Sequence, residues 1–199
     1  MDLDNLHSIA FDGALMPDYL EKLRNGINGS TSDQIILVET TPDKSQEVTM
    51  ELVKLLSQKN ERGIVVSANR PYTNLINVYK RNNIDVSKMF ILDCISKNQN
   101  GNFDADNAVF LENVSSLTDI SLSINEHLNG SSASKFVIFD SITTMLIHNK
   151  PYIFARFIHN ILTKMRIHGV GGVLISIADN SNREIRAEIA QLCDKVITI

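Results

Sequence analysis

Short apolar runs alternate along this chain with longer stretches in which apolar residues recur at helical spacing, and this alternation constrains the fold more than any other feature. The first run covers residues 34–39, a helical stretch follows over residues 44–59, and a second run begins at Gly63. A continuous apolar run of this kind is typical of a strand buried on both faces. Because strands linked by crossover helices run parallel to one another, the pattern predicts a parallel sheet.

The same alternation continues to the end of the chain. Further strands are expected at residues 64–67, 89–92, 109–111, 136–140, 173–177 and 196–199, with helices between them, the longest over residues 151–168. The polar stretch 96–107, rich in Asn and Gly, is expected to form a surface loop. We therefore predict an α/β fold: a single three-layer α/β/α domain with a mostly parallel central sheet over residues 34–199. Residues 1–33 are expected to form an N-terminal helix and a linker.

The composition excludes several classes of protein. Of the 199 residues, 43% are hydrophobic and 21% are charged, which excludes a disordered tail, a collagen-like repeat and a polytopic membrane protein. The formal net charge of −4 argues against a dedicated nucleic-acid-binding domain, which would carry a basic excess. Any basic site must therefore be local.

Cysteine usage and the first residues of the chain bear on its location. Cys94 and Cys193 lie in or beside apolar runs with no CxxC motif, which suits buried thiols in a reducing compartment. The first residues are acidic where a signal peptide would be basic, and no apolar run approaches the roughly 20 residues that span a bilayer. We expect a cytoplasmic protein without membrane contact.

A degenerate phosphate loop follows the first predicted strand. Residues 38–45 have the length and the Lys-Ser ending of the GxxxxGK[ST] motif, but Val38 and Asp43 stand where the motif has glycines. Those glycines let backbone N–H groups approach the phosphates, while the lysine and the hydroxyl meet phosphate and magnesium. The candidate residues of a vestigial or weak nucleotide site here are Thr40, Thr41, Pro42, Asp43, Lys44 and Ser45.

The carboxylate of Asp43 would repel a phosphate ligand. A carboxylate about 4 Å from a phosphate charge costs on the order of 4 kcal/mol at an effective dielectric constant near 20. The alternative is a purely structural turn, in which Pro42 and Asp43 begin the next helix, Asp43 caps it and Lys44 is solvated.

A second candidate is the aspartate that ends the predicted strand over residues 136–140. Four apolar residues followed by Asp140 have the form of a Walker B strand, in which the aspartate holds Mg²⁺ through water, and Ser141 comes directly after it. The alternative role for Asp140 is to cap the following turn. No cofactor and no metal are expected, except that Asp140 would help to hold Mg-ATP if a nucleotide binds.

Several stretches carry a resemblance to a known family. Residues 63–71, 84–93 and 136–144, together with the closing strand 193–199, resemble the RecA-like ATPases, and within them the KaiC-like group common in archaea. The resemblance spans residues 34–199 and implies the RecA-like P-loop NTPase fold, assembly into oligomers and a role in signal transduction.

The chain departs from this family at the catalytic positions. Active KaiC-like members have a glycine-rich phosphate loop and a catalytic glutamate, usually one of a pair, just after the second strand, where this sequence has Asn69 and Arg70. An amide cannot act as the general base that activates water, and Arg70 has the wrong charge. The resemblance therefore implies a pseudoenzyme, a catalytically inactive domain that acts by contacts with a protein partner or with its own copies in signalling or regulation.

A local basic stretch follows Asp140. Residues 141–178 contain no acidic residue, and a possible partner face on the predicted helix 151–168 consists of Arg156, His159, Lys164 and Arg166. Such a face is often merely solvated. The alternative is contact with an acidic protein or a nucleic acid, although no aromatic residue is expected on this face for stacking.

Three functions remain open at this stage: the inactive domain, a divergent Mg-ATP-binding ATPase that still uses Lys44, Ser45 and Asp140, and a nucleic-acid accessory protein that uses the basic helix. A zinc site and a serine hydrolase are excluded, because no histidine pair has ligand spacing and no GxSxG motif occurs.

Overall fold

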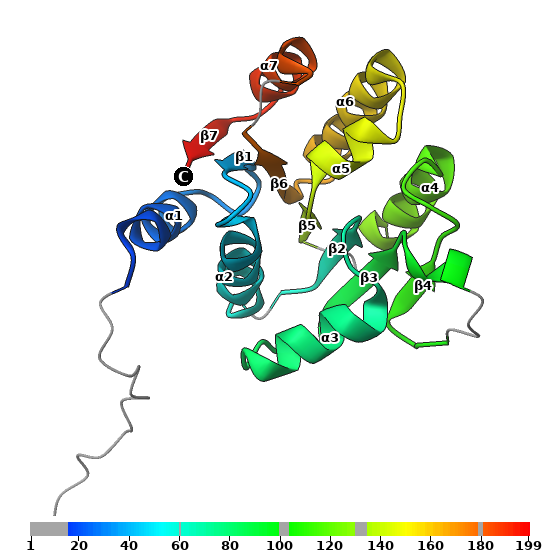
Figure 1. Ribbon diagram of the computed structural model, residues 1–199, viewed down its shortest axis with the longest axis horizontal. Coiled ribbons are helices and arrows are strands. Elements are labelled where there is room, and N and C mark those ends of the chain that lie inside the picture. The colour runs from blue at the N-terminus through cyan, green and yellow to red at the C-terminus, as the bar shows by residue number, and fades with distance from the viewer. Residues whose placement is uncertain (1–15, 60, 100–103, 130–134, 179–180) are drawn as a thin grey trace, which may run out of the picture.

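The sheet has seven strands, all parallel. The computed structural model describes residues 16–59, 61–99, 104–129, 135–178 and 181–199. Within them the strand order is β4-β3-β2-β5-β6-β1-β7, and each neighbouring pair runs parallel (Figure 1). The strands are β1 (Ile35–Thr40), β2 (Gly63–Ser67), β3 (Met89–Asp93), β4 (Ala108–Phe110), β5 (Phe136–Phe139), β6 (Gly171–Ile177) and β7 (Lys195–Thr198). The predicted fold class is confirmed.

Helices cover both faces of the sheet, so the sheet is the middle one of three layers (Figure 1). On one face lie α1 (Asp18–Asn28), α2 (Ser45–Ser57) and α3 (Tyr72–Arg81); on the other lie α4 (Leu117–Leu128), α5 (Ile142–Ile147), α6 (Pro151–Ile167) and α7 (Arg183–Gln191). Successive strand residues point to opposite faces, so Ile35 and Leu37 join the core under α4 to α7, whereas Ile36 and Val38 join the core under α1 to α3.

The helix α1 shares the core of the sheet. Leu20, Leu23 and Ile27 are buried against the same cluster as the apolar residues of α2. The Lys195 ammonium donates a hydrogen bond to the Gly26 carbonyl at 2.8 Å, which joins α1 to the edge strand β7. This packing brings Tyr19 of α1 near the start of α2.

Two short helices appear where no helix was expected from the sequence. Residues Ser96–Gln99 form a 3-10 helix within the stretch predicted as a loop. Asp93, the last residue of β3, holds the chain that leads into it by accepting backbone hydrogen bonds from Ile95 at 2.7 Å and Ser96 at 2.9 Å. The second is α5, which Ser141 caps by accepting the Thr144 N–H at 3.0 Å. Its six residues are too few to show a helical period in a sequence.

The carboxyl ends of the strands meet at one edge of the sheet, as they must when all strands are parallel. Ser67 ends β2, Asp140 follows β5, and Ile177 ends β6, so residues distant in sequence come together there. Ligands of open α/β sheets bind at this edge. None of the helices in the described part of the chain is long and apolar enough to span a membrane.

Candidate functional site

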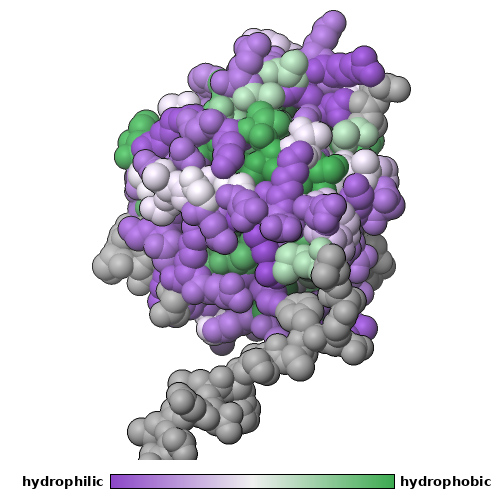
Figure 2. All heavy atoms as spheres, turned by 90° about the vertical axis from the view of Figure 1, so that its left-hand side faces the viewer, coloured by the Kyte–Doolittle hydropathy of each residue, from purple (hydrophilic) through white to green (hydrophobic). Residues whose placement is uncertain are grey.

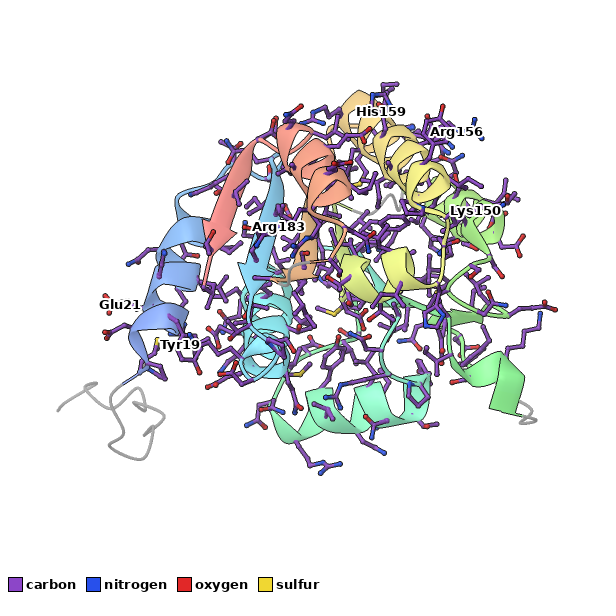
Figure 3. All side chains as sticks on the ribbon, turned by 45° about the horizontal axis from the view of Figure 1, so that its top comes forward. Tyr19, Glu21, Lys150, Arg156, His159 and Arg183 are labelled. Atoms are coloured by element: carbon purple, nitrogen blue, oxygen red, sulfur yellow. The ribbon has the colours of Figure 1, made fainter. Side chains whose placement is uncertain are left out.

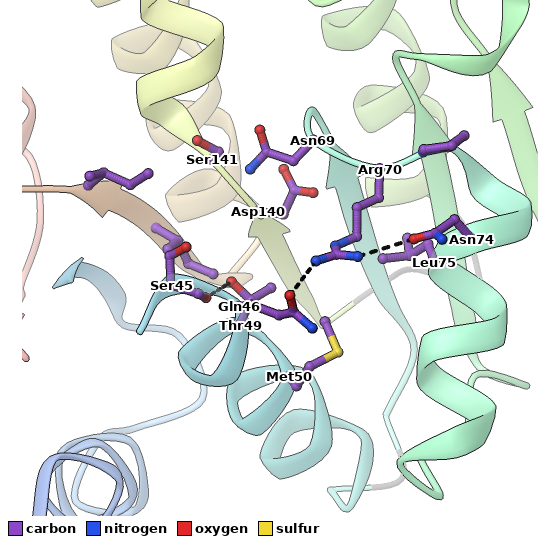
Figure 4. A pocket seen from close by; sticks show the side chains of 13 residues that line it. Ser45, Gln46, Thr49, Met50, Asn69, Arg70, Asn74, Leu75, Asp140 and Ser141 are labelled. Carbon is purple, nitrogen blue, oxygen red and sulfur yellow. Dashed lines mark hydrogen bonds between the residues drawn. The ribbon is translucent and has the colours of Figure 1, made fainter. Parts of the chain in front are cut away.

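A polar cleft of about 350 Å³ lies at this edge, between the start of α2 and the loops that follow β2 and β5 (Figure 4). Of the eight residues predicted for a nucleotide site, Ser45, Asp140 and Ser141 line the cleft. The other five, Thr40, Thr41, Pro42, Asp43 and Lys44, are not on its wall. The structure therefore brings together the Walker B-like residues and the last residue of the degenerate phosphate loop, but not the rest of that loop.

The connection between β1 and α2 is a tight turn. Val38, the first position of the degenerate motif, pairs with Ile175 inside the sheet, and β1 continues through Thr40, which pairs with Ile177. Only residues 41–44 connect the strand to the helix, and the Lys44 N–H donates to the Thr41 carbonyl at 3.2 Å. Three positions of the eight-residue motif are thus committed to the strand, which leaves too little chain to surround a phosphate group.

The Lys44 side chain points to α1. Its ammonium nitrogen lies 4.9 Å from the centroid of the Tyr19 ring, a cation–π contact. The Tyr19 hydroxyl donates a hydrogen bond to the Glu47 carboxylate, and this bond is the main cause that raises the pKa of Tyr19 above its usual value. Lys44 is therefore held on the outside of the turn, by a ring that sequence spacing does not connect with it.

Asp140 is buried and bound to the loop after β2. Its Oδ1 accepts the Ala68 N–H at 2.8 Å, and its Oδ2 lies 3.1 Å from the Ser67 hydroxyl. Burial raises the pKa of Asp140 to about 6, against the opposing effect of the Ala68 N–H and of the Arg70 guanidinium. Ser45 makes no bond to Asp140; its hydroxyl donates to the Pro42 carbonyl at 3.1 Å. The carboxyl thus joins β5 to the β2–α3 loop.

Arg70 stands on the wall of the cleft. Its guanidinium donates to Gln46 Oε1 at 2.8 Å and to Asn74 Oδ1 at 3.1 Å (Figure 4). The neighbouring Asn69 accepts a hydrogen bond from the Thr144 hydroxyl at 2.6 Å. Both side chains are therefore fixed by partners on other elements. Among the described residues, Asp140 is the only carboxylate that lines the cleft.

Sequence reasoning missed Gln46 and Asn74, the residues that hold Arg70. They lie in the first turns of α2 and α3 and belong to no motif, so only the packing of these helices shows that their amides converge. Nor do the described residues contain a group of three or more His, Cys, Asp or Glu side chains that could hold a metal ion.

The predicted partner face on α6 is divided. Arg156 and His159 are exposed, whereas the Lys164 ammonium donates to the Ser121 hydroxyl at 3.4 Å and Arg166 forms an ion pair with Asp194 at 2.9 Å. The expectation that the face carries no aromatic residue is wrong. Tyr152 is 73% exposed and lies one helical turn before Arg156, on the same side of the helix.

A second cavity has a volume of about 630 Å³. Residues of α1, α2 and the segment after α3 line it, with Leu20, Met50 and Ile84 as its apolar part. Figure 2 shows apolar residues gathered in the middle of the face that carries α1, surrounded by hydrophilic ones. No predicted site residue lies in this cavity.

Comparison with known proteins bears on the fold. Neither the protein-family models nor the curated proteins include a significant match to this chain. Among solved structures, a KaiC-like protein from the hyperthermophilic archaeon Pyrococcus horikoshii OT3 matches it with a TM-score of 0.51 and 13% sequence identity, over 83% of this chain and 70% of that one. At this identity the likeness shows the fold alone: the chain has the RecA-like fold of a KaiC-like protein.

Proposed function

We propose that this chain is a RecA-like domain that does not hydrolyse ATP and acts through contacts with other proteins, in signalling or regulation. The observation that carries the proposal is the turn of residues 41–44, which replaces a phosphate loop and directs Lys44 onto Tyr19. Without the loop glycines and with the lysine held elsewhere, the cleft lacks the phosphate-loop amides and the lysine that hold the phosphates of ATP, and the cation that remains, Arg70, is bound to Gln46 and Asn74.

The positions of the catalytic glutamates support the same proposal. Asn69 and Arg70 occupy them, and each is bound to neighbouring side chains. A general base must accept a proton from water, which neither an amide nor a guanidinium does at neutral pH. Asp140 is within the cleft, but its oxygens already face the Ala68 N–H and the Ser67 hydroxyl.

The setting that we infer is a reducing one, the cytoplasm of an archaeal cell. Both cysteines are free, and burial raises the pKa of the Cys94 thiol and, to about 12, that of Cys193. Such thiols stay protonated and unreactive, as structural cysteines in a reducing compartment do. The signalling role, the archaeal source and assembly with a partner or with further copies are taken from the resemblance to KaiC-like proteins.

The competing function is a divergent Mg-ATP-binding ATPase. The lining of the cleft supports this function. The space of about 350 Å³ is lined by three residues with hydroxyl groups and one with a carboxyl group: Ser45, Thr49, Ser141 and Asp140. For this function Lys44 would have to leave Tyr19, and Asp140 would have to exchange the Ala68 N–H for a water ligand of Mg²⁺.

Calorimetric titration of the full chain with Mg-ATP separates the two functions. We expect no saturable heat up to millimolar nucleotide, and no difference between the wild type, Lys44→Ala and the control Lys22→Ala, which changes an exposed lysine of α1. Saturable binding that Lys44→Ala abolishes and Lys22→Ala preserves would overturn the proposal in favour of the ATPase.

A further inference from the structure

Large apolar side chains are exposed where α5 meets α6. Ile147 is 65% exposed at the end of α5, and Tyr152 and Ile153 are 73% and 44% exposed in the first turn of α6. Single exposed apolar residues are normal on protein surfaces, but three within seven residues of chain form a patch. We call this patch and its basic neighbours the junction surface; it comprises Ile147, Lys150, Tyr152, Ile153, Arg156 and His159. Figure 3 labels its three basic residues, Lys150, Arg156 and His159.

The charge on the junction surface is positive. Lys150, Arg156 and His159 lie along the outer side of α6 in Figure 3, and in the ranges that the structure describes their side chains form no hydrogen bond or ion pair with the protein. No acidic residue occurs anywhere from Ser141 to Ala178. Arg156 lies three residues after Ile153 and four after Tyr152, so the cation is next to both apolar side chains.

The start of α6 adds to this positive field. Lys150 precedes the helix, the first turn contains no acidic residue, and no side chain accepts a hydrogen bond from the first N–H groups. Helix N-termini carry a partial positive charge and favour a nearby carboxylate. An acidic side chain from outside this segment would therefore be attracted to the same place as the exposed apolar residues.

The backbone beneath the junction surface is anchored to the rest of the domain. The Ser115 hydroxyl donates to the His148 carbonyl at 2.8 Å, and the Asn149 amide donates to the Val114 carbonyl at 3.1 Å and to the Met145 carbonyl at 2.8 Å. The opposite face of α6 is buried in the core through Phe154, Phe157, Ile158, Ile161 and Met165. Backbone that is fixed in advance loses little conformational entropy when a partner binds.

We propose that the junction surface docks an acidic, amphipathic segment of a partner protein. The apolar side of the segment packs on Ile147, Tyr152 and Ile153, and its carboxylates face Lys150 and Arg156. The inference rests on the proposed function, because it names the chemistry of the partner through which the inactive domain acts.

Charge and side-chain type favour a protein segment over the other ligands of basic surfaces. A nucleic acid is a polyanion, which the net charge of −4 repels more strongly than it repels a segment with a few carboxylates, and its bases stack on aromatic rings and not on the aliphatic side chains of Ile147 and Ile153. An anionic membrane is bound by clusters of about four to eight basic residues. The junction surface supplies two, with one histidine. A few carboxylates beside apolar side chains match it better.

The test measures binding of a defined probe by fluorescence anisotropy. The probe is a labelled synthetic peptide of about four helical turns, with leucines along one side and glutamates along the other. A second peptide replaces each glutamate by lysine, and a third replaces each leucine by serine. The proteins are the full wild-type chain, Arg156→Glu, Ile153→Ser and the control Arg81→Glu, which makes the same charge change at the exposed end of α3.

We expect saturable binding of the acidic amphipathic peptide to the wild type and to Arg81→Glu, weakened about tenfold or more in Arg156→Glu and in Ile153→Ser. Both other peptides should bind the wild type at least about tenfold more weakly. Arg156 and Ile153 are exposed, so we expect both substitutions to leave the core intact. An unchanged far-UV circular dichroism spectrum and melting temperature will show that the variants fold.

Four results would overturn the proposal. They are the absence of saturable binding, equal binding by wild type and Arg156→Glu, tighter Arg156-dependent binding of a single-stranded oligonucleotide or a phosphatidylserine vesicle, and a self-association in sedimentation that Arg156→Glu abolishes. The last would make a second copy the occupant. The Mg-ATP titration reports on the cleft and not on α6, so failure of the docking proposal and failure of the proposed function are read in separate experiments.

Discussion

The Ser67 hydroxyl lies 3.1 Å from Asp140 Oδ2 and 2.9 Å from the carbonyl oxygen of Arg70. A hydroxyl has one proton, so Ser67 shares its donation between the Asp140 carboxylate and the Arg70 carbonyl, and its bond to Asp140 acts to lower the pKa of that carboxyl. Burial outweighs this bond and raises the pKa of Asp140 to about 6.

The first prediction follows from that pKa. Between about pH 4 and pH 6 the folded chain keeps a proton on Asp140 that the unfolded chain has lost, so the free energy of unfolding should fall as pH rises through this window. The loss amounts to about 3 kcal/mol at full ionisation, because each unit of pKa difference is worth about 1.4 kcal/mol. Asp140→Asn places a permanent donor beside Ser67 and should flatten this part of the profile. Urea unfolding of both proteins from pH 4 to pH 8 checks it, and parallel profiles would contradict it.

Arg70 should keep the pKa of Asp140 from rising further. Its guanidinium is the charged group that lowers that pKa, and Arg70→Gln removes the charge while retaining an amide that can reach Gln46 or Asn74. We expect the pKa of Asp140 to rise above about 6 in this variant. The measurement is a carbon-13 NMR titration of the carboxyl, with Arg81→Gln as the control, and an unchanged pKa in Arg70→Gln would show that solvent screens the guanidinium.

The contact of Lys44 with Tyr19 should be measurable as a coupling energy. Lys44→Ala and Tyr19→Leu each remove one partner, and a double-mutant cycle should give about 0.5–1 kcal/mol, the usual range for an exposed cation–π pair. Chemical unfolding of the four proteins supplies the cycle. Additive effects would mean that Lys44 does not rest on the ring in solution and is available to the cleft.

Asp93 should be the most sensitive polar residue of the core. It is fully buried and accepts hydrogen bonds from the backbone N–H groups of Tyr72, Ile95 and Ser96 at 2.7 to 2.9 Å. Asp93→Ala leaves these donors unsatisfied and should lower the free energy of unfolding by at least about 3 kcal/mol. Asp93→Asn keeps one acceptor and should cost less. Equal costs for the two variants in urea unfolding would contradict this account.

A neighbouring aromatic ring leaves no room for a side chain at Gly63. A Cβ atom at Gly63 would lie 2.0 Å from the ring of Phe136, its partner in the pairing of β2 with β5. Gly63→Ala should therefore cost about 1–3 kcal/mol through overpacking. In the background of Phe136→Leu, which removes the ring, the added cost of Gly63→Ala should be smaller. Thermal unfolding of the single and double variants compares the two costs.

Much of the fold could be predicted from the sequence because its signals are local. The runs at residues 34–39 and 136–139 are strands, and the helical spacing of residues 151–168 marks α6, since periodicity reports directly on which face of an element is buried. The short helix α5 and the 3-10 helix after Asp93 were not predicted from the sequence. Single capping residues, Ser141 and Asp93, set where they form, and neither helix shows a helical period of apolar residues.

The candidate site was predictable only in part. The order of strands and helices was enough to place Asp140 and Ser141 at the carboxyl edge of the sheet, because that order fixes where parallel strands end. The replaced glycines at Val38 and Asp43 already indicated a defective phosphate loop. How far β1 extends into the motif could not be read from the sequence, since Thr40 is added to the strand by its pairing with Ile177 of β6.

By itself, then, the sequence determined the layered α/β architecture, the residue types at the strand ends and the absence of acid from residues 141–178. Only the tertiary structure decided that Lys44 lies on Tyr19, that Gln46 and Asn74 hold Arg70, and that Tyr152 and Arg156 share an exposed face. The physical reason is the distance along the chain over which each kind of interaction acts. Periodicity and turn chemistry act between neighbours in the chain, whereas these contacts depend on how separate elements pack and on which side chains the packing leaves in solvent.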